Sequence, residues 1–143
     1  MKKVLIASDH AGLPLKSFLV EKLKTDFEFL DLGTHDEKSV DYPDFAAKLC
    51  EALLAKKADT GILVCGSGQG MAMKANHYKG VRAALCWNLA SAQLSRQHND
   101  ANVLCLGSRL IPFDEALEIT RAWIATPFEG GRHQMRVAKI DQS

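Results

Sequence analysis

The sequence lacks the features of several large protein classes. Its 143 residues contain no apolar run of membrane-spanning length, and only four apolar residues come directly before Ser8 and Asp9. Four such residues are too few for the core of a signal peptide. The net charge is only +1, so no overall field would attract nucleic acid or a membrane surface. We therefore expect a cytoplasmic protein.

The cysteines do not follow a metal-binding pattern. The chain has four of them, and no two form a C-x-x-C pair, which disfavours a zinc site. Without a secretory signal we expect the thiols to be reduced. Cys86 and Cys105 lie within apolar runs, so we expect both in the core.

The glycines do not form a standard nucleotide-binding motif. Gly66, Gly68 and Gly70 have the spacing G-x-G-x-G, which is neither the dinucleotide motif G-x-G-x-x-G nor a P-loop. Lys74 comes four residues after the last glycine, so it does not supply the P-loop lysine. A nucleotide cofactor is therefore not indicated. From the motif alone, anion binding and a merely tight turn are equally supported.

Apolar runs and helical periodicities alternate along the whole chain. Strands are predicted at 3–7, 27–32, 62–65, 81–87 and 103–106. Helices are predicted at 13–26, 44–57, 68–77, 88–99, 111–126 and 132–140, with Asn88 as an N-cap. This order predicts one α/β domain over residues 1–143, a three-layer α/β/α sandwich around a five-stranded parallel sheet. Ligands bind such sheets beyond the carboxyl ends of the strands, where the strand order reverses.

Cys65 stands where a predicted strand meets the glycine turn. The free amides of such a turn and the following helix N-terminus attract an anion and favour a thiolate. An isolated cysteine is more often a small buried core residue, but this position makes Cys65 the best candidate base or nucleophile in the chain. As a nucleophile it would need a neighbouring histidine, which His10 or His98 could supply.

Two pairs of polar residues are further candidates. Asp9 and His10 directly follow the first predicted strand. The pair could simply cap a turn, but charged groups at this edge are unfavourable without a partner or ligand, so a functional role is favoured. His98 and Asn99 end a predicted helix. There a histidine can complement the helix dipole and Asn99 can serve as a C-cap, so structural and functional roles are equally supported.

Three arginines are candidate phosphate ligands. Arg132 and Arg136 are four residues apart on the last predicted helix and so share a face, and Arg109 follows the last predicted strand. Guanidinium groups form forked contacts with phosphate. The last helix also has a separate apolar face, which indicates that it docks onto another surface.

With these residues collected, the sequence resembles the family that contains type B ribose-5-phosphate isomerases and galactose-6-phosphate isomerase subunits. The resemblance covers the whole chain. It rests on SDHAG at 8–12, DYPD at 41–44, CGSGQGM at 65–71, SAQLSRQHNDANVL at 91–104, GSR at 107–109 and EGGRHQMRV at 129–137. It implies a Rossmann-like or flavodoxin-like fold. It also implies a homodimer with sites at the subunit interface, where helix 132–140 would dock, and a tetramer stays open as an alternative.

The resemblance also implies a reaction and roles for the candidate residues. It implies metal-free, cofactor-free conversion of an aldose phosphate to a ketose phosphate, with Cys65 as the base and His98 as the ring-opening group. The implied sugar-binding residues are Asp9, His10 and Asn99. The turn that would hold the enediolate oxygens is Gly66, Ser67, Gly68, Gln69 and Gly70. The implied phosphate ligands are Arg109, Arg132 and Arg136.

Several alternatives stay open at this point. One branch of the family has a glutamate near the third glycine instead of the cysteine; this chain has Met71 there and so resembles the cysteine branch. The expected substrate pair is ribose 5-phosphate and ribulose 5-phosphate, and the alternative is allose or galactose 6-phosphate. A non-catalytic sugar-phosphate-binding protein is a further alternative. A cysteine phosphatase is disfavoured, because no arginine lies between Cys65 and Arg82.

Overall fold

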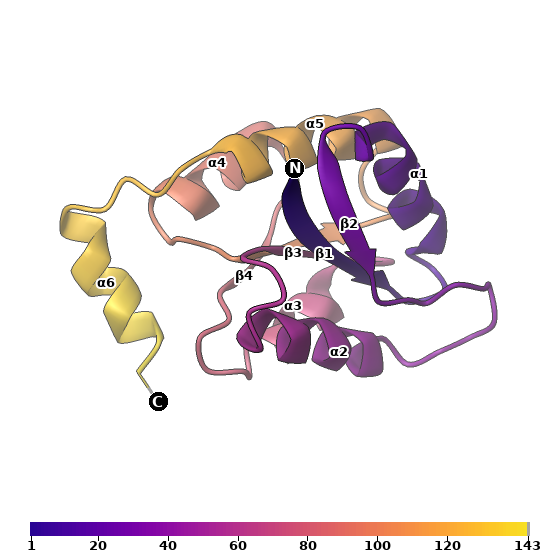
Figure 1. Cartoon of the computed structure of the whole chain (residues 1–143), viewed down its shortest axis with the longest axis horizontal. Coiled ribbons are helices and arrows are strands. Elements are labelled where there is room, and N and C mark those ends of the chain that lie inside the picture. Colours follow the sequence, from indigo (N-terminus) through magenta and orange to yellow (C-terminus); the bar gives the residue numbers. More distant parts are fainter. Residues whose placement is uncertain (143) are drawn as a thin grey trace.

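The computed structural model describes residues 1–142, which form a three-layer sandwich with one helix standing apart (Figure 1). All five strands are parallel, in the order β2-β1-β3-β5-β4. The strands are β1 (Lys2–Ser8), β2 (Phe27–Asp31), β3 (Gly61–Cys65), β4 (Ala83–Leu85) and β5 (Val103–Gly107). The helices are α1 (Leu13–Leu23), α2 (Tyr42–Leu54), α3 (Gln69–Ala75), α4 (Leu89–Gln97), α5 (Phe113–Ala125) and α6 (Arg132–Ile140).

The three central strands are covered on both faces. Every residue of β3 and β5 is buried, and so are the last five residues of β1, which explains why these segments are continuous apolar runs rather than alternating ones. One face packs against α1, α4 and α5 and the other against α2 and α3. The edge strand β2 alternates between exposed and half-buried residues.

The fourth strand is shorter than the sequence predicts. The prediction spans 81–87, whereas β4 contains only Ala83–Leu85. Side chains take the backbone donors at both ends: the amide of Arg82 donates to Asn102 Oδ1 at 2.7 Å, and that of Trp87 to Ser91 Oγ at 3.1 Å. The chain is therefore already entering the cap of α4. Asn88 is the predicted N-cap, and its Oδ1 accepts from the Ser91 amide at 2.8 Å.

The order of the strands reverses between β1 and β3. The chain leaves β1 toward β2 on one side of the sheet, and it leaves β3 toward β4 on the other. The loops after these two strands therefore diverge and leave a crevice at the carboxyl edge. The loop after β1 crosses close to β3, because a Cβ on Gly12 would lie only 2.3 Å from the carbonyl oxygen of Val64. The crevice thus begins where Asp9 and Cys65 leave the sheet.

Helix α6 lies apart from the sandwich, at the opposite end from the arrowheads of β1 and β2 (Figure 1). Only His133 and Val137 are buried in it, while Met135 and Ile140 are 70% and 54% exposed. An ion pair from Arg82 Nη1 to Asp141 Oδ2, 2.9 Å long, ties its far end to the domain. The apolar side chains of α6 are thus largely uncovered within one chain. Among residues 1–142, no helix combines the length and apolarity needed to cross a membrane.

Substitutions of two adjacent leucines on α2 test which of them belongs to the hydrophobic core. Leu53 is 5% exposed and belongs to the core, whereas Leu54 is 42% exposed. We expect Leu53→Ala to lower the free energy of unfolding by about 2–5 kcal/mol, and Leu54→Ala to lower it by about 1 kcal/mol or less. Urea denaturation at one fixed protein concentration measures both, and equal losses would contradict the assignment.

Candidate active site

A hollow of about 360 Å³ opens at the carboxyl edge of the sheet, between the ends of β1, β3 and β5. It is lined by Asp9, Tyr42, Cys65, Gly66, Ser67, Gly70, Arg109 and Leu110. All but Tyr42 and Leu110 are residues that the sequence predicts for a site. The structure therefore brings together side chains that lie up to about one hundred positions apart in the chain, because parallel strands end at the same edge.

Cys65 ends β3 and is held by the turn that follows it. The amide of Gly68 donates to Cys65 Sγ at 3.2 Å, a contact that is stronger when the sulfur carries negative charge. Gly68 has φ of +78°, and a Cβ there would lie 2.9 Å from the carbonyl carbon of Leu106. A side chain at this position would therefore displace the amide that faces the sulfur.

The loop after β5 holds the glycine turn in place. The amide of Ser108 donates to the carbonyl of Cys65 at 2.9 Å, and that of Arg109 to the carbonyl of Gly66 at 3.0 Å. A Cβ on Gly66 would lie 3.1 Å from Arg109 Nη1, so the guanidinium lies directly over the turn. The hollow therefore combines a thiol, main-chain amides and one fixed positive charge, a set suited to an anionic substrate.

Asp9 lines the hollow, whereas its neighbour His10 is not among the lining residues and contacts the adjoining loop. Asp9 is 7% exposed, and its Oδ1 accepts from the Gly12 amide at 2.9 Å, so it also caps the turn as the sequence suggests. His10 Nδ1 accepts from the Val40 amide at 3.2 Å. In the neutral ring Nε2 then carries the hydrogen, so His10 can donate to a substrate oxygen.

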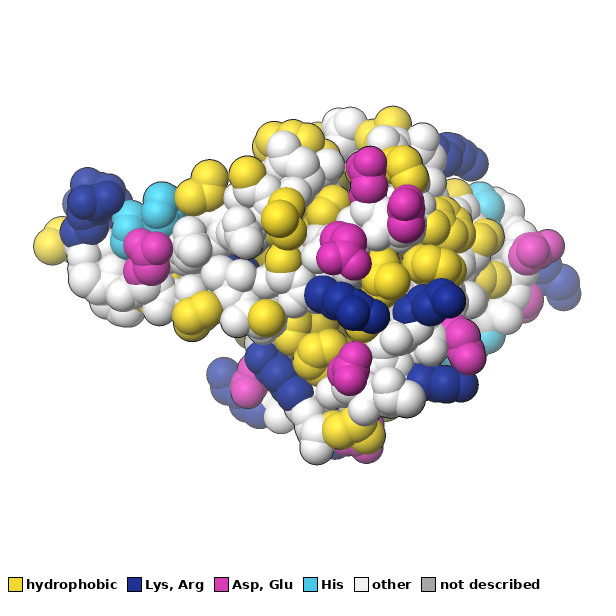
Figure 2. All heavy atoms as spheres, turned by 90° about the horizontal axis from the view of Figure 1, so that it is seen from above, with side chains coloured by type: hydrophobic (Ala, Val, Ile, Leu, Met, Phe, Trp, Pro, Cys, Tyr) yellow, Lys and Arg dark blue, Asp and Glu magenta, His cyan; other side chains and the backbone are white. Residues whose placement is uncertain are grey.

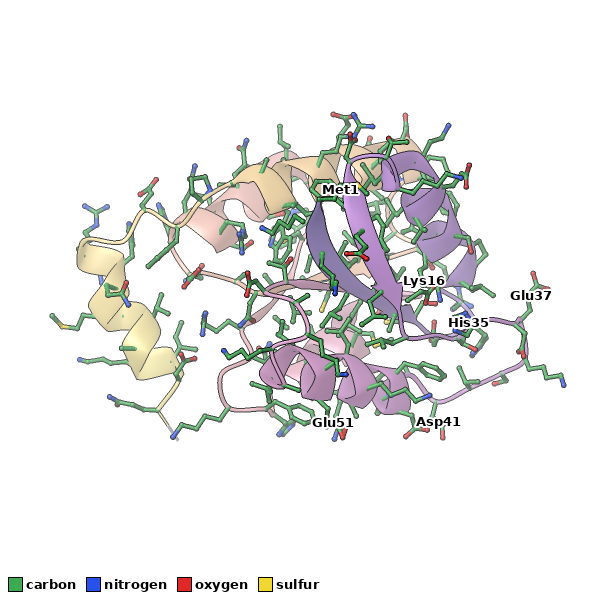
Figure 3. The ribbon with its side chains drawn as sticks, in the orientation of Figure 1. Met1, Lys16, His35, Glu37, Asp41 and Glu51 are labelled. Carbon is green, nitrogen blue, oxygen red and sulfur yellow. The ribbon has the colours of Figure 1, made fainter. Side chains whose placement is uncertain are left out.

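Sequence reasoning missed two residues that shape this edge. Tyr42 lines the hollow and packs so closely on Gly70 that a Cβ there would lie 2.4 Å from its ring. Lys16, 1% exposed, donates from Nζ to Asp31 Oδ1 at 2.7 Å and to the carbonyl of Thr34 at 2.5 Å. Figure 3 shows Lys16 beside the end of β2, where the loop carrying His35 and Glu37 begins. Lys16 therefore anchors the loop whose Val40 holds His10.

The remaining candidates form a second group at the other end of the molecule. His98 is the C-cap of α4, with its amide bonded to the carbonyl of Leu94, so the cap is not Asn99. Asp100, two residues further on, has a φ of +48°. Arg132 and Arg136 are exposed on α6. The imidazoles of His98 and His133 stack with their centroids 4.3 Å apart. Burial and the neighbouring His98 lower the pKa of His133.

The two groups do not meet within one chain. Cys65 lies beside Gly107, the last residue of β5, whereas His98 precedes Val103, its first residue. Five residues of strand separate the two edges by about 13 Å, and α6 extends further away still (Figure 1). One chain therefore holds two separate groups of candidate residues, one with Cys65 and Arg109 and one with His98, Arg132 and Arg136.

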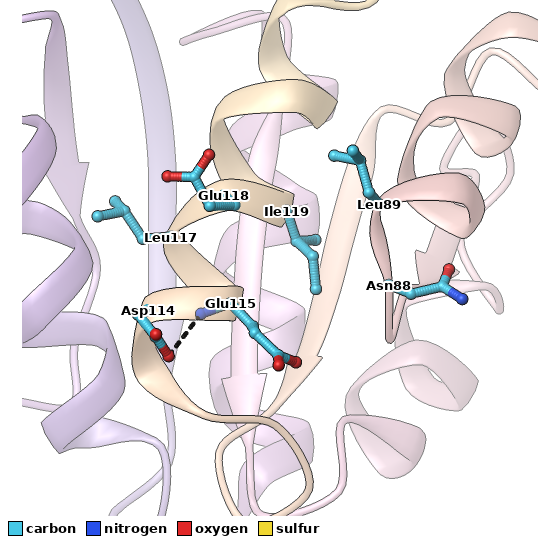
Figure 4. A pocket seen from close by; sticks show the side chains of 7 residues that line it. All are labelled: Asn88, Leu89, Asp114, Glu115, Leu117, Glu118 and Ile119. Atoms are coloured by element: carbon cyan, nitrogen blue, oxygen red, sulfur yellow. Dashed lines mark hydrogen bonds between the residues drawn. The ribbon is translucent and has the colours of Figure 1, made fainter.

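A larger hollow, of about 540 Å³, lies between the start of α4 and one side of α5 (Figure 4). It contains Leu89 and the three carboxylates Asp114, Glu115 and Glu118. Three negative charges around one hollow repel a phosphate, and the hollow holds no cysteine, histidine or arginine. The smaller hollow at Cys65 is therefore the candidate active site.

Comparisons with known proteins match nearly the whole chain. A family model described as ribose/galactose isomerase matches residues 4–140. The chain is 44% identical over 141 residues to ribose-5-phosphate isomerase B of Escherichia coli, covering 98% of this chain and 95% of the relative. A ribose 5-phosphate isomerase structure from Thermotoga maritima aligns with a TM-score of 0.97 at 48% identity, over 99% of both chains.

A third relative carries a ligand. The structure of ribose-5-phosphate isomerase B from Mycoplasma genitalium with bound ribulose-5-phosphate aligns with a TM-score of 0.92 at 46% identity, covering 97% of this chain and 93% of that one.

The surroundings of the cysteines predict which one reacts with an alkylating reagent. Burial raises the pKa of Cys50 to about 12 and also raises the pKa values of Cys86 and Cys105. These thiols therefore keep their protons near neutral pH and lie in the core, whereas Cys65 lines the open hollow. We expect iodoacetamide to label Cys65 first in the folded protein, as read by peptide mass spectrometry. Equal labelling of Cys65 and Cys105 would contradict this, and Cys65→Ala is the control.

Proposed function

Because this chain belongs to the ribose/galactose isomerase family, we propose that it is an aldose-ketose isomerase that interconverts ribose 5-phosphate and ribulose 5-phosphate. One observation carries the proposal: the Cys65 thiol, the amides of the glycine turn and the Arg109 guanidinium converge on one hollow. The relative with bound ribulose-5-phosphate supports a pentose phosphate as the substrate.

Cys65 is the base in this proposal. As a thiolate, Sγ takes the proton from the carbon next to the carbonyl of the open-chain sugar, and the resulting enediolate receives that proton back on the adjacent carbon. A hydrogen-bond donor 3.2 Å from Sγ stabilises the thiolate before each cycle. The net reaction moves hydrogen between two carbons and between their oxygens, so no redox partner is required.

The glycine turn stabilises the enediolate. Gly66, Ser67 and Gly70 line the hollow, and Gly68 and Gln69 complete the turn. The first N–H groups of a helix have no partner within the helix. At the start of α3 the amide of Gln69 donates to Ser67 Oγ at 3.3 Å, which leaves the amides of Gly70 and Met71 to face the developing negative charge. Losing one such donor lowers the rate by about 10²–10³ in enzymes that use this device.

Ring opening and most of the phosphate binding come from a second copy of the chain. His98 supplies the acid and base for opening the furanose ring, with Asn99 beside it, and Arg132 and Arg136 hold the phosphate together with Arg109. We take the two groups of candidate residues as half-sites. Their separation within one chain and the exposed apolar side chains of α6 support a dimer in which each chain completes the site of the other. A two-fold symmetric dimer then has two equivalent sites.

The substrate also suggests where the protein works. Sugar phosphates carry a double negative charge and do not leave the cell by crossing a membrane unaided. We place the isomerase in the cytoplasm for this reason.

Cys65→Ala tests the base. We expect the variant to lose the exchange of substrate hydrogen for solvent deuterium by at least about 10²-fold, because a positioned general base contributes about 10²–10⁴ to the rate. The measurement is deuterium incorporation into the sugar phosphate, followed by NMR or mass spectrometry. Exchange at the wild-type rate would show that Cys65 is not the base.

Mixing two inactive variants tests whether sites are shared between chains. Cys65→Ala and His98→Ala are each expected to be inactive on the cyclic sugar. After denaturation and refolding as an equal mixture, half of the dimers combine one chain of each kind and contain one intact site out of two. We therefore expect about a quarter of the wild-type activity. No recovery, in a mixture whose dimers are shown by mass spectrometry to have exchanged chains, would contradict a shared site.

A further inference from the structure

His98, Glu129 and His133 form a compact cluster of side chains between α4 and α6. Glu129 Oε1 lies 3.8 Å from His98 Nε2 and 3.5 Å from His133 Nε2. One donor atom from each residue lies within 4.8 Å of the other two. Figure 2 shows histidine and acidic side chains gathered with basic ones at the end of the molecule where α6 projects.

The backbone holds the three residues in this arrangement. The amide of Glu129 donates to the carbonyl of Gln97 at 3.1 Å, which places Glu129 next to His98. Arg96 anchors the same segment, since its Nε donates to the carbonyl of Thr126 at 3.1 Å. His133 lies in the first turn of α6, four residues after Glu129, and its amide donates to the carbonyl of Gly130 at 3.1 Å. Main-chain hydrogen bonds therefore fix the backbone positions of the residues in the cluster.

Two imidazole nitrogens and one carboxylate oxygen are a zinc-type ligand set. Bonds of 2.0–2.2 Å to a tetrahedral ion place neighbouring ligand atoms about 3.3–3.6 Å apart, close to the 3.5 and 3.8 Å observed. Magnesium and calcium instead require sets made mostly of oxygen. An open hollow of about 400 Å³ borders Glu129 and His133, with Arg132 also in its lining, so water has access to these two ligands.

We propose that His98, Glu129 and His133 form a binding site for a divalent transition-metal ion of the zinc type. The two rings lie 12° from parallel, so His98 must tilt for both lone pairs to point at one ion. Its side chain is 39% exposed and has the space to do so. His133, only 9% exposed, provides the fixed ligand.

Metal binding would inhibit the isomerase. An ion on His98 Nε2 occupies the lone pair that takes up a proton during ring opening, so the enzyme stops until the ion is released. This consequence rests on the proposed role of His98, whereas the binding site itself does not. The ion is thus a reversible inhibitor and takes no part in the reaction.

Binding is tested with the tag-free, full-length protein and Zn²⁺ alone. The dissociation constant and stoichiometry are measured by competition with a chromogenic chelator. We expect one Zn²⁺ per chain and no binding of Mg²⁺. Glu129→Gln and His133→Asn should each weaken binding by at least about tenfold, since loss of even an outer partner of a metal ligand has an effect of that size. Glu118→Gln and His77→Asn, exposed residues outside the cluster, are the matched controls.

Cys65 is the competing zinc ligand, because it lines an open hollow, whereas the pKa values of the other three cysteines are raised by burial. Zn²⁺ affinity that persists in Cys65→Ala and falls in Glu129→Gln supports the cluster. The proposed cluster site is overturned if Zn²⁺ affinity is lost in Cys65→Ala and unchanged in Glu129→Gln and His133→Asn. It is also overturned if the wild-type protein does not bind Zn²⁺. Circular dichroism establishes that each variant is folded.

Activity then separates the two proposals. We expect Zn²⁺ to inhibit the isomerase reaction of the wild-type protein and a chelator to restore the rate. Glu129→Gln should need at least about tenfold more Zn²⁺ than wild type for the same inhibition. If Zn²⁺ binds at the cluster without changing the isomerase rate, the result supports the metal site and contradicts the ring-opening role of His98.

Discussion

The parallel pairing of β1, β3 and β5 is the constraint on which the rest of the molecule depends. Their register places Ser8 beside Val64 and Cys65 beside Gly107, so the three loops that follow leave from one edge. Those loops can approach one another only because glycines lie at the crossings: a Cβ on Gly107 would lie 2.6 Å from the carbonyl oxygen of Ser67. Backbone contact at this distance is what holds the thiol, the amides and Arg109 around one hollow.

The same polarity of the sheet keeps the two proposed half-sites of one chain apart. Residues before a parallel strand and residues after it lie at opposite edges, so His98 cannot share an edge with Cys65 in one chain. Helix α6 extends the second half-site away from the domain and leaves Met135 and Ile140 exposed. A second copy that covers those side chains would also bring His98, Arg132 and Arg136 to Cys65. The proposed catalysis and the proposed dimer therefore have one structural cause.

Much of the architecture could be read from local pattern, and the failures have identifiable causes. The continuous apolar runs of β1, β3 and β5 predict buried strands because both faces are covered. The prediction for β4 was too long because Asn102 and Ser91 bind the amides at its ends, and a side-chain contact twenty residues away leaves no trace in a window of sequence. Lys16 was missed for a similar reason: on a helix it looks like a solvent-exposed charge, and only tertiary structure shows its contacts with Asp31 and Thr34.

The sequence by itself determined the α/β class, the order of the elements and the strand-to-glycine junction at Cys65, because hydrophobic periodicity and glycine positions act over a few residues. Its motifs also pointed to the family that the comparisons then showed. Only the tertiary structure decided that Asp9, Cys65 and Arg109 share a hollow while His98 and α6 lie at the other edge. It also brought His98, Glu129 and His133 together. These groupings depend on strand order and on contacts between distant segments, which no local pattern encodes.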